Sequence, residues 1–256
     1  MPAPKNNLTD SSFWSAHWSD ATVSRNPLGY EDRVWRGVYD QTFRDAPAHA
    51  RCLEVGCGNS QHLVAIAGYG LEVAGIDFTE NGCRLAREWL TKAGIEGEIL
   101  QRDMFEANDD LAGQFDYVVS FGLIEHFDDP SEPLRAMRRL LKPGGHILTT
   151  TPNVDPHSLT VRVRRIIGPK ILAAHKLMSL DEVKGFHERS GFQTLTCQLQ
   201  GMGLSLACDE PSRSNRVVRF IAYRTVQAIR KTLEVLRIPP PPLRLTGLLM
   251  VYIGRA

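Results

Sequence analysis

The stretch LEVGCGNS, residues 53–60, decides the fold of this chain. It begins in a short apolar run, which predicts a buried strand, and it turns through Gly56 and Gly58 into a predicted helix. Glycines at such a turn let a ligand approach the backbone closely, and the helix that follows offers free N–H groups. A plain tight turn is the alternative interpretation of this segment taken alone.

The residues around the turn argue against a dinucleotide as the ligand. The pattern is ExGxG, so the third glycine of the GxGxxG fingerprint is missing. Glu54 also stands where its carboxylate would repel a pyrophosphate. An acidic side chain at the mouth of the turn suits a ligand that carries positive charge.

Strands and helices alternate along the rest of the chain. Short apolar runs predict strands over 51–55, 71–77, 97–103, 115–121 and 146–152. Periodic segments predict helices over 60–68, 79–94 and 131–145, the last of them stopped by Pro143 and two glycines. A helix over 179–192 and strands over 193–200 and 245–256 follow. This order predicts a parallel sheet with helices on both faces.

Carboxylates follow two of these strands. Asp77 ends the second strand, about 20 residues after the glycines, where a carboxylate can accept both hydroxyls of an adenosine ribose. Its alternative role is a helix N-cap, but Thr79 is the better cap, which would leave Asp77 free. Asp103 can accept from the exocyclic amine of adenine while Met104 packs on the ring, or it can be a solvated loop acid. Ligands bind at the carboxyl ends of such strands.

Five segments together resemble one known family. LEVGCGNSQHL, GIDFTENGCRLA, EILQRDMF, FDYVVSFGLIEHFDDP and LLKPGGHILTTTPN are similar, in order and spacing, to the motifs of class I S-adenosylmethionine (SAM)-dependent methyltransferases. The resemblance covers residues 50–200. It implies a Rossmann-like α/β fold with a seven-stranded sheet of order 3-2-1-4-5-7-6, the last strand antiparallel. The insertion at about 201–245 departs from the minimal family pattern.

The resemblance also implies a cofactor site and a branch of the family. In that site Glu54 holds the ammonium of SAM, Asp77 binds its ribose, and the Ser120–Phe121 backbone lies along the cofactor. The full set of implied cofactor residues is Glu54, Gly56, Cys57, Gly58, Asp77, Phe78, Asp103, Met104, Ser120 and Phe121. LIEHFDDP followed by TTTPN is most similar to the small-molecule branch that includes ubiquinone-biosynthesis O-methyltransferases. No [DN]PPY-type motif, which marks many amine methylases, is present.

Methyl transfer itself needs alignment and the exclusion of water, and a base can take the acceptor's proton. His126 is the candidate base because it follows the fourth strand at the mouth of the site and histidine titrates in the useful range. Its alternative is a packing residue at a helix start. Glu125 and His126 could help to bind a divalent ion, but two ligands are not a site, so no metal is predicted.

The acceptor side is predicted to involve flanking segments. Residues 1–48 are predicted to form a helical lid on a methyltransferase domain over 49–256. The residues proposed to contact a small organic acceptor are Trp14, His17, Trp18, Tyr30 and Asn153. For each of them, packing of a helix against the edge of the sheet is the alternative role.

Composition limits the partners. The net charge of +1 leaves no global excess to hold nucleic acid by phosphate contacts, so nucleic acid is not an expected partner. Five cysteines without a CxxC pair favour a reducing, cytoplasmic setting, and no apolar leader or membrane span is expected. The insertion carries an amphipathic helix over 214–237, and a peripheral membrane contact is expected to use 158–172 or 213–237. A monomer or a homodimer is expected.

Overall fold

The computed structural model describes residues 8–9, 12–15, 30–106, 108–203, 213–237 and 243–256. Seven strands form one sheet in the order β3-β2-β1-β4-β5-β7-β6. They are β1 (Arg51–Val55), β2 (Glu72–Asp77), β3 (Gly97–Gln101), β4 (Phe115–Phe121), β5 (Leu141–Pro152), β6 (Gln193–Met202) and β7 (Gly247–Arg255). Neighbours among β1 to β5 pair in parallel, and β7 runs antiparallel to both β5 and β6. The predicted strand order and the antiparallel last strand are confirmed.

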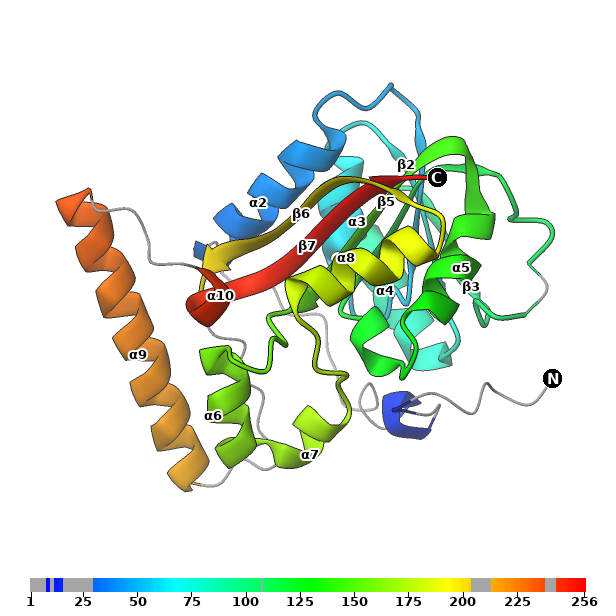
Figure 1. Cartoon of the computed structure of the whole chain (residues 1–256). Coiled ribbons are helices and arrows are strands. Elements are labelled where there is room, and N and C mark those ends of the chain that lie inside the picture. The colour runs from blue at the N-terminus through cyan, green and yellow to red at the C-terminus, as the bar shows by residue number, and fades with distance from the viewer. Residues whose placement is uncertain (1–7, 10–11, 16–29, 107, 204–212, 238–242) are drawn as a thin grey trace.

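Helices cover both faces of this sheet (Figure 1). They are α2 (Tyr30–Phe43), α3 (His62–Ala67), α4 (Glu80–Ala93), α5 (Ser131–Leu140), α6 (Leu159–Ile167), α7 (Pro169–Ala173), α8 (Leu180–Arg189), α9 (Arg213–Leu236) and α10 (Leu243–Thr246). A 3-10 turn, Ile124–His126, follows β4. The caps of α4 and α8 form as predicted, because Thr79 accepts from the Gly82 N–H and Ser179 forms a capping box with Glu182.

Helix α5 ends before Pro143, and it is five residues shorter than the predicted helix over 131–145. The helix ends at Leu140, and Leu141 is already extended and paired with Phe115 of β4. The residue before a proline is pushed out of the helical region, so Lys142 cannot be helical. The helix therefore has to end before the proline itself, and β5 begins five residues earlier than the predicted strand over 146–152.

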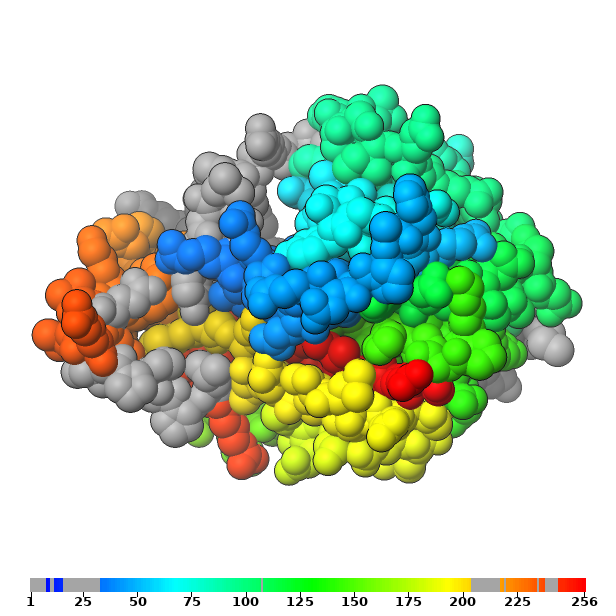
Figure 2. Space-filling view, turned by 90° about the horizontal axis from the view of Figure 1, so that it is seen from above, coloured from blue at the N-terminus to red at the C-terminus, as the bar shows by residue number. Residues whose placement is uncertain are grey.

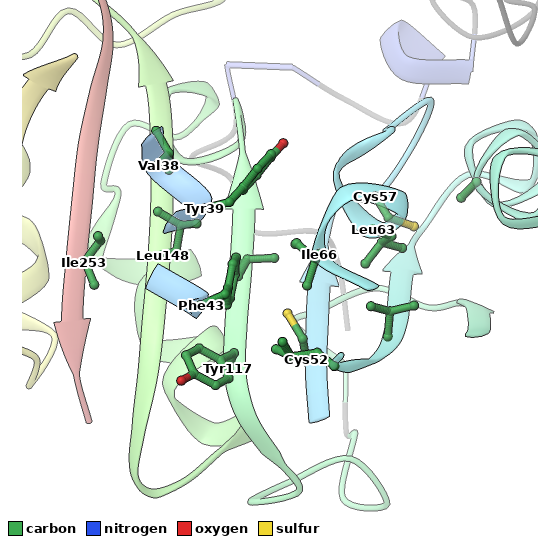
Figure 3. Close-up of a cluster of buried hydrophobic side chains, with 14 of the residues drawn as sticks. Val38, Tyr39, Phe43, Cys52, Cys57, Leu63, Ile66, Tyr117, Leu148 and Ile253 are labelled. Carbon is green, nitrogen blue, oxygen red and sulfur yellow. The ribbon is translucent and has the colours of Figure 1, made fainter. Parts of the chain in front are cut away.

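Two apolar layers form the core. On one face, α2 and α3 pack on the central strands through Val38, Phe43 and Ile66, against Tyr117 of β4 and Leu148 of β5 (Figure 3). On the other face, α5 and α8 contribute Leu134, Met137 and Val183. On the first face, α2 and α3 both contact Phe121 at the carboxyl end of β4.

The insertion helix is present, but its apolar face is only partly covered. Ala222, Val226 and Leu233 of α9 pack with Met202 and Leu159. The predicted apolar face also included Val218, Ile221, Thr225, Ile229 and Leu236, and of these Ile221, Ile229 and Leu236 are exposed. The helix touches the body along a narrow line, so most of its apolar side chains remain uncovered. Among the described helices, none combines the length and the apolar character that crossing a membrane requires.

Candidate cofactor site

A cavity of about 260 Å³ opens at the carboxyl ends of β1, β2 and β4. Its volume is close to the lower end of the range for small-molecule sites. Its lining residues are Trp14, Glu54, Gly56, Cys57, Gly58, Asn59, Ser60, His62, Asp77, Phe78, Phe121, Gly122 and Leu123. Most of the residues that the sequence motifs assign to the cofactor therefore meet in one place.

The glycine turn is held open by its backbone conformation. Gly56 has a φ of +73°, which only glycine adopts without strain. A Cβ on Gly56 would lie 3.1 Å from Cδ1 of Leu123, so a side chain there would also crowd the wall of the cavity. The N–H groups of Gly56 and Cys57 both donate to the Ile76 carbonyl at the end of β2, at 2.8 and 3.1 Å. The turn is thereby tied to the neighbouring strand.

Glu54 presents an unpartnered carboxylate oxygen at this turn. Its side chain is buried, and Oε2 has no hydrogen-bond partner. Burial raises the pKa of Glu54 well above its usual range, the Ser60 side chain opposes this by hydrogen bonding, and nearby Asp77 adds to it. A buried carboxylate without a counter-charge is unfavourable, so a bound ammonium would stabilise the ionised form. The residues therefore fit the cationic methionine end of SAM.

Asp77 is not free, and that prediction was wrong. Its Oδ2 accepts the Gly58 N–H at 3.0 Å, and its Oδ1 accepts both the N–H and the hydroxyl of Thr79, at 2.8 and 2.6 Å. Thr79 caps α4 as predicted, yet it also holds the carboxylate. Each carboxylate oxygen can accept two hydrogen bonds, so Oδ2 keeps room for one donor from a ribose. Asp77 thus organises the turn and lines the cavity at once.

Aromatic side chains from two helices close one wall. His62, in the first turn of α3, stacks on Phe121 with ring centroids 3.7 Å apart, and Trp35 of α2 meets the His62 ring edge-on at 4.5 Å. The Tyr39 hydroxyl lies 2.6 Å from Nδ1 of His62. Burial lowers the pKa of His62 to about 3, so the ring is neutral at physiological pH. Sequence reasoning missed His62, and the histidine directly after the glycine turn is the signal that could have identified it.

Trp14 reaches the cavity from the N-terminal segment. It lines the cavity, donates from its indole N–H to the Thr9 hydroxyl at 2.9 Å, and meets the His126 ring edge-on at 4.9 Å. Of the other residues proposed for the acceptor, His17 and Trp18 lie outside the described residues. Tyr30 begins α2, and its side chain is also outside the described part.

His126 lies behind Trp14 and is not among the residues that line the cavity. Its ring is buried, and Nδ1 lies 2.7 Å from the Ala174 carbonyl. A carbonyl only accepts, so Nδ1 carries the proton and Nε2 is the basic atom. The structure thus gives His126 the tautomer that a general base at Nε2 requires, one side chain away from the cavity.

A buried polar cluster surrounds His126. Glu125, His126 and His175 each place a ligand-type atom within 4.8 Å of the others. Burial raises the pKa of Glu125 to about 8, and the charge of buried Arg164 opposes this rise. The guanidinium of Arg164 also lies 3.5 Å from Nε2 of His175. A fixed positive charge next to these groups disfavours a metal cation among them.

Besides His126, four predicted site residues in the described part of the chain do not line the cavity. Asp103 accepts the Phe105 N–H at 2.9 Å, and Met104 packs at the edge of the core. Ser120 is fully buried in β4. Asn153 is also buried, donates to the Arg244 carbonyl at 3.1 Å and accepts from the Asp155 N–H. Asn153 therefore ties the end of β5 to α10, a structural role in the segment that follows the site.

The fold is an α/β sheet with a cavity at the carboxyl ends of its strands and a buried carboxylate in that cavity, and comparison with known proteins gives the family. A family model described as a methyltransferase domain matches residues 28–197. A ubiquinone biosynthesis O-methyltransferase from Xanthomonas axonopodis pv. citri is 31% identical over 192 residues, which cover 74% of this chain and 76% of that protein. The chain belongs to the SAM-dependent methyltransferases.

Two further comparisons agree with this assignment. A ubiquinone biosynthesis O-methyltransferase from Bordetella avium is 36% identical over 144 residues, which cover 56% of this chain and 59% of that protein, less than two thirds of its length. The crystal structure of a SAM-dependent methyltransferase from Archaeoglobus fulgidus superposes with a TM-score of 0.56 at 21% identity, covering 89% of this chain and 95% of that one. At this identity the likeness shows the shared fold alone.

Proposed function

We propose that this protein transfers a methyl group from SAM to a small organic acceptor. The observation that carries the proposal is the buried Oε2 of Glu54, which lacks a partner at the glycine turn of a methyltransferase fold. Bound SAM supplies an already activated methyl group, so the protein has to bind, orient and exclude water.

The lining residues divide these tasks. Glu54 fits the ammonium, and Oδ2 of Asp77 has capacity for one ribose hydroxyl. Phe121, His62 and Trp14 form an aromatic wall that excludes water from the reacting end. We propose His126 as the base that takes the acceptor's proton through Nε2; its Nδ1 contact with the Ala174 carbonyl and its ring contact with Trp14 at the cavity support this role.

A phenol-type hydroxyl is the acceptor class that we propose. Two relatives are named ubiquinone biosynthesis O-methyltransferases, and the wall next to the cavity offers the flat apolar surfaces on which an aromatic ring packs. The exposed apolar side chains of α9 favour a second candidate, a lipid-like phenol or quinone that the protein meets at a membrane surface.

The test has two stages. Calorimetry should show one site per chain for SAM or S-adenosylhomocysteine, and the absence of binding to folded protein would overturn the cofactor proposal. Labelled SAM should then transfer its methyl group to members of a panel of phenols and lipid-like quinols, with amines as the comparison. Transfer to amines alone would keep the enzyme class and overturn the acceptor class.

A further inference from the structure

Helix α9 projects from one end of the molecule (orange in Figures 1 and 2). It has 24 residues. Its contact with the body is narrow: Ala222, Val226 and Leu233 pack near Met202 and Leu159. Among the α9 side chains that the structure describes, Val226 alone is buried. The helix is therefore attached along one side and open on the other.

The open side carries large apolar side chains. Seven of them have exposed fractions between 45% and 72%: Val217, Phe220, Ile221, Tyr223, Ile229, Val235 and Leu236. At 3.6 residues per turn, Val217, Ile221 and Val235 point within about 40° of one another, opposite the buried Val226. Val217 and Ile221 are one turn apart, and Val235 lies about 21 Å further along the same side, beyond Arg224 and Lys231. Apolar and cationic side chains therefore alternate along the outer side of the helix. We call Val217, Ile221 and Val235 the outer strip.

Positive charge accompanies the strip. Residues 213–237 contain seven of the chain's 30 basic residues and one of its 29 acidic residues, so this segment has a net charge of +6 while the rest of the chain has −5. Arg224 and Lys231 are exposed on α9 and flank the outer strip. The Arg224 guanidinium lies 6.0 Å from the centroid of the Phe220 ring. The cationic and apolar groups thus share one side of the helix.

We propose that the outer side of α9 binds the surface of an anionic lipid bilayer. The outer strip enters the boundary between headgroups and acyl chains, and Arg224 and Lys231 contact the negatively charged headgroups. Apolar insertion combined with electrostatic attraction is how basic amphipathic helices lie in the plane of a membrane. The proposal rests on α9 and does not depend on the methyl acceptor.

The neighbouring helix α6 has the same chemistry. Leu159, at its start, belongs to the cluster that holds α9. Arg162, Arg165 and Ile166 are exposed on α6, and Ile166 is 75% exposed. A lipid surface that receives α9 therefore meets a second basic and apolar element beside it.

Other occupants fit less well. An isologous contact with a second copy would place two segments of charge +6 side by side, which costs electrostatic energy. A nucleic acid would use the basic side chains but would leave the aliphatic strip without a partner. A bilayer with anionic headgroups satisfies both features at once.

Co-sedimentation with vesicles tests the proposal. The full-length protein should pellet with vesicles of equal parts phosphatidylcholine and phosphatidylglycerol and stay in solution with phosphatidylcholine alone. Binding should weaken in high salt, because the Debye length falls from about 8 Å at 0.15 M to about 3 Å at 1 M. Two variants should each lower the partition coefficient at least tenfold: Val217→Ser with Ile221→Ser and Val235→Ser, and Arg224→Gln with Lys231→Gln.

Matched controls separate this surface from general effects. Leu195→Ser removes an exposed large side chain from β6, and Arg84→Gln with Arg135→Gln removes two exposed charges from α4 and α5. These controls should bind vesicles like the unmodified protein, and circular dichroism should show that every variant is folded. Failure of the unmodified protein to bind anionic vesicles, or equal binding by the α9 variants, would overturn the proposal. So would a dimer that the outer-strip variant converts to a monomer without a change in lipid binding.

Discussion

The hydroxyl of Tyr39 lies 2.6 Å from Nδ1 of His62, and the same imidazole stacks on Phe121. Two helices, α2 and α3, are thereby joined directly at the wall of the cavity. Because the Tyr39 hydroxyl is hydrogen-bonded to Nδ1, the orientation of the His62 ring is fixed, and Nε2 points away from Tyr39. The contact links the N-terminal helix to the geometry of the cofactor site.

Tyr39→Phe should therefore weaken cofactor binding. Without the hydroxyl the His62 ring is no longer held, and binding of S-adenosylhomocysteine has to order it again. The cost is at most that of the lost hydrogen bond, about 1 kcal/mol, so the Kd measured by calorimetry should rise by up to about fivefold. Tyr69→Phe is the matched control, because its hydroxyl donates to Asp40 at 2.6 Å and Tyr69 does not line the cavity. A rise of the same size in both variants would show that the effect comes from general loosening of α2.

Glu54→Gln should weaken binding of SAM more strongly. The variant loses a charge-assisted contact with the ammonium, worth about 1.5–3 kcal/mol, so the Kd should rise at least tenfold. Burial raises the pKa of Glu54 in the free protein, so SAM affinity of the unmodified protein should also fall as the pH is lowered through that raised value. Glu98→Gln, on the exposed part of β3, should change neither property. Unchanged affinity in Glu54→Gln would remove Glu54 from the site.

Asp77 should affect stability as well as binding. Asp77→Ala leaves the N–H groups of Gly58 and Thr79 without their acceptor, at a cost of about 1–3 kcal/mol each if they stay buried, and it also removes the ribose contact. Thr79→Ala removes the helix cap, worth about 1 kcal/mol, and one hydrogen bond to Asp77, but it keeps the carboxylate, so the Kd should rise less than in Asp77→Ala. Thermal unfolding and calorimetry on both variants separate the two roles. An Asp77→Ala protein with full stability would contradict the structural role.

The fold was predictable from the sequence, but the hydrogen bonds and ring contacts of the site were predictable only in part. The strands follow from apolar runs that are local in sequence, and their order is what the resemblance to the family implies. The acceptors and donors around Asp77 depend on how Gly58 approaches it across 19 residues of chain, which no local pattern encodes. His62 depends on a tyrosine 23 residues earlier, on another helix. Tertiary placement decides both.

Stability should respond to pH through Glu125. Burial raises the pKa of Glu125 to about 8, whereas the unfolded carboxyl ionises near its ordinary value of 4.5. The unfolded state therefore releases its proton first, and the free energy of unfolding falls as the pH rises from about 4.5 to about 8. Glu125→Gln cannot ionise. Its free energy of unfolding should therefore rise relative to that of the unmodified protein, by up to a few kcal/mol between pH 5 and pH 8, and its melting temperature should rise in the same direction.

Glu96→Gln is the control for this pH series, because Glu96 is exposed and its replacement should leave the pH dependence unchanged. Melting curves at several pH values give the comparison. Parallel pH profiles for the unmodified protein and Glu125→Gln would mean that Arg164 keeps Glu125 ionised in the folded protein, against the direction expected from burial.

His126→Gln tests the proposed general base. If Nε2 takes the acceptor's proton, single-turnover methyl transfer should slow by about 10²–10⁴ while SAM affinity stays close to that of the unmodified protein. The unmodified enzyme should also show a pH dependence of the rate that the variant lacks. His175→Gln is the matched control, because the ring centroids of His175 and His126 are 4.7 Å apart in the same cluster and His175 has no proposed contact with the acceptor.

The competing mechanism needs only alignment. On that view the acceptor loses its proton to water, His126→Gln slows transfer only slightly, and the pH profile follows the acceptor itself. Trp14 helps to distinguish the two mechanisms, because it lines the cavity and contacts the His126 ring edge-on. Trp14→Ala should therefore change the acceptor's KM whichever mechanism holds. A rate loss in His126→Gln that Trp14→Ala does not alter would place the proton transfer at His126 itself.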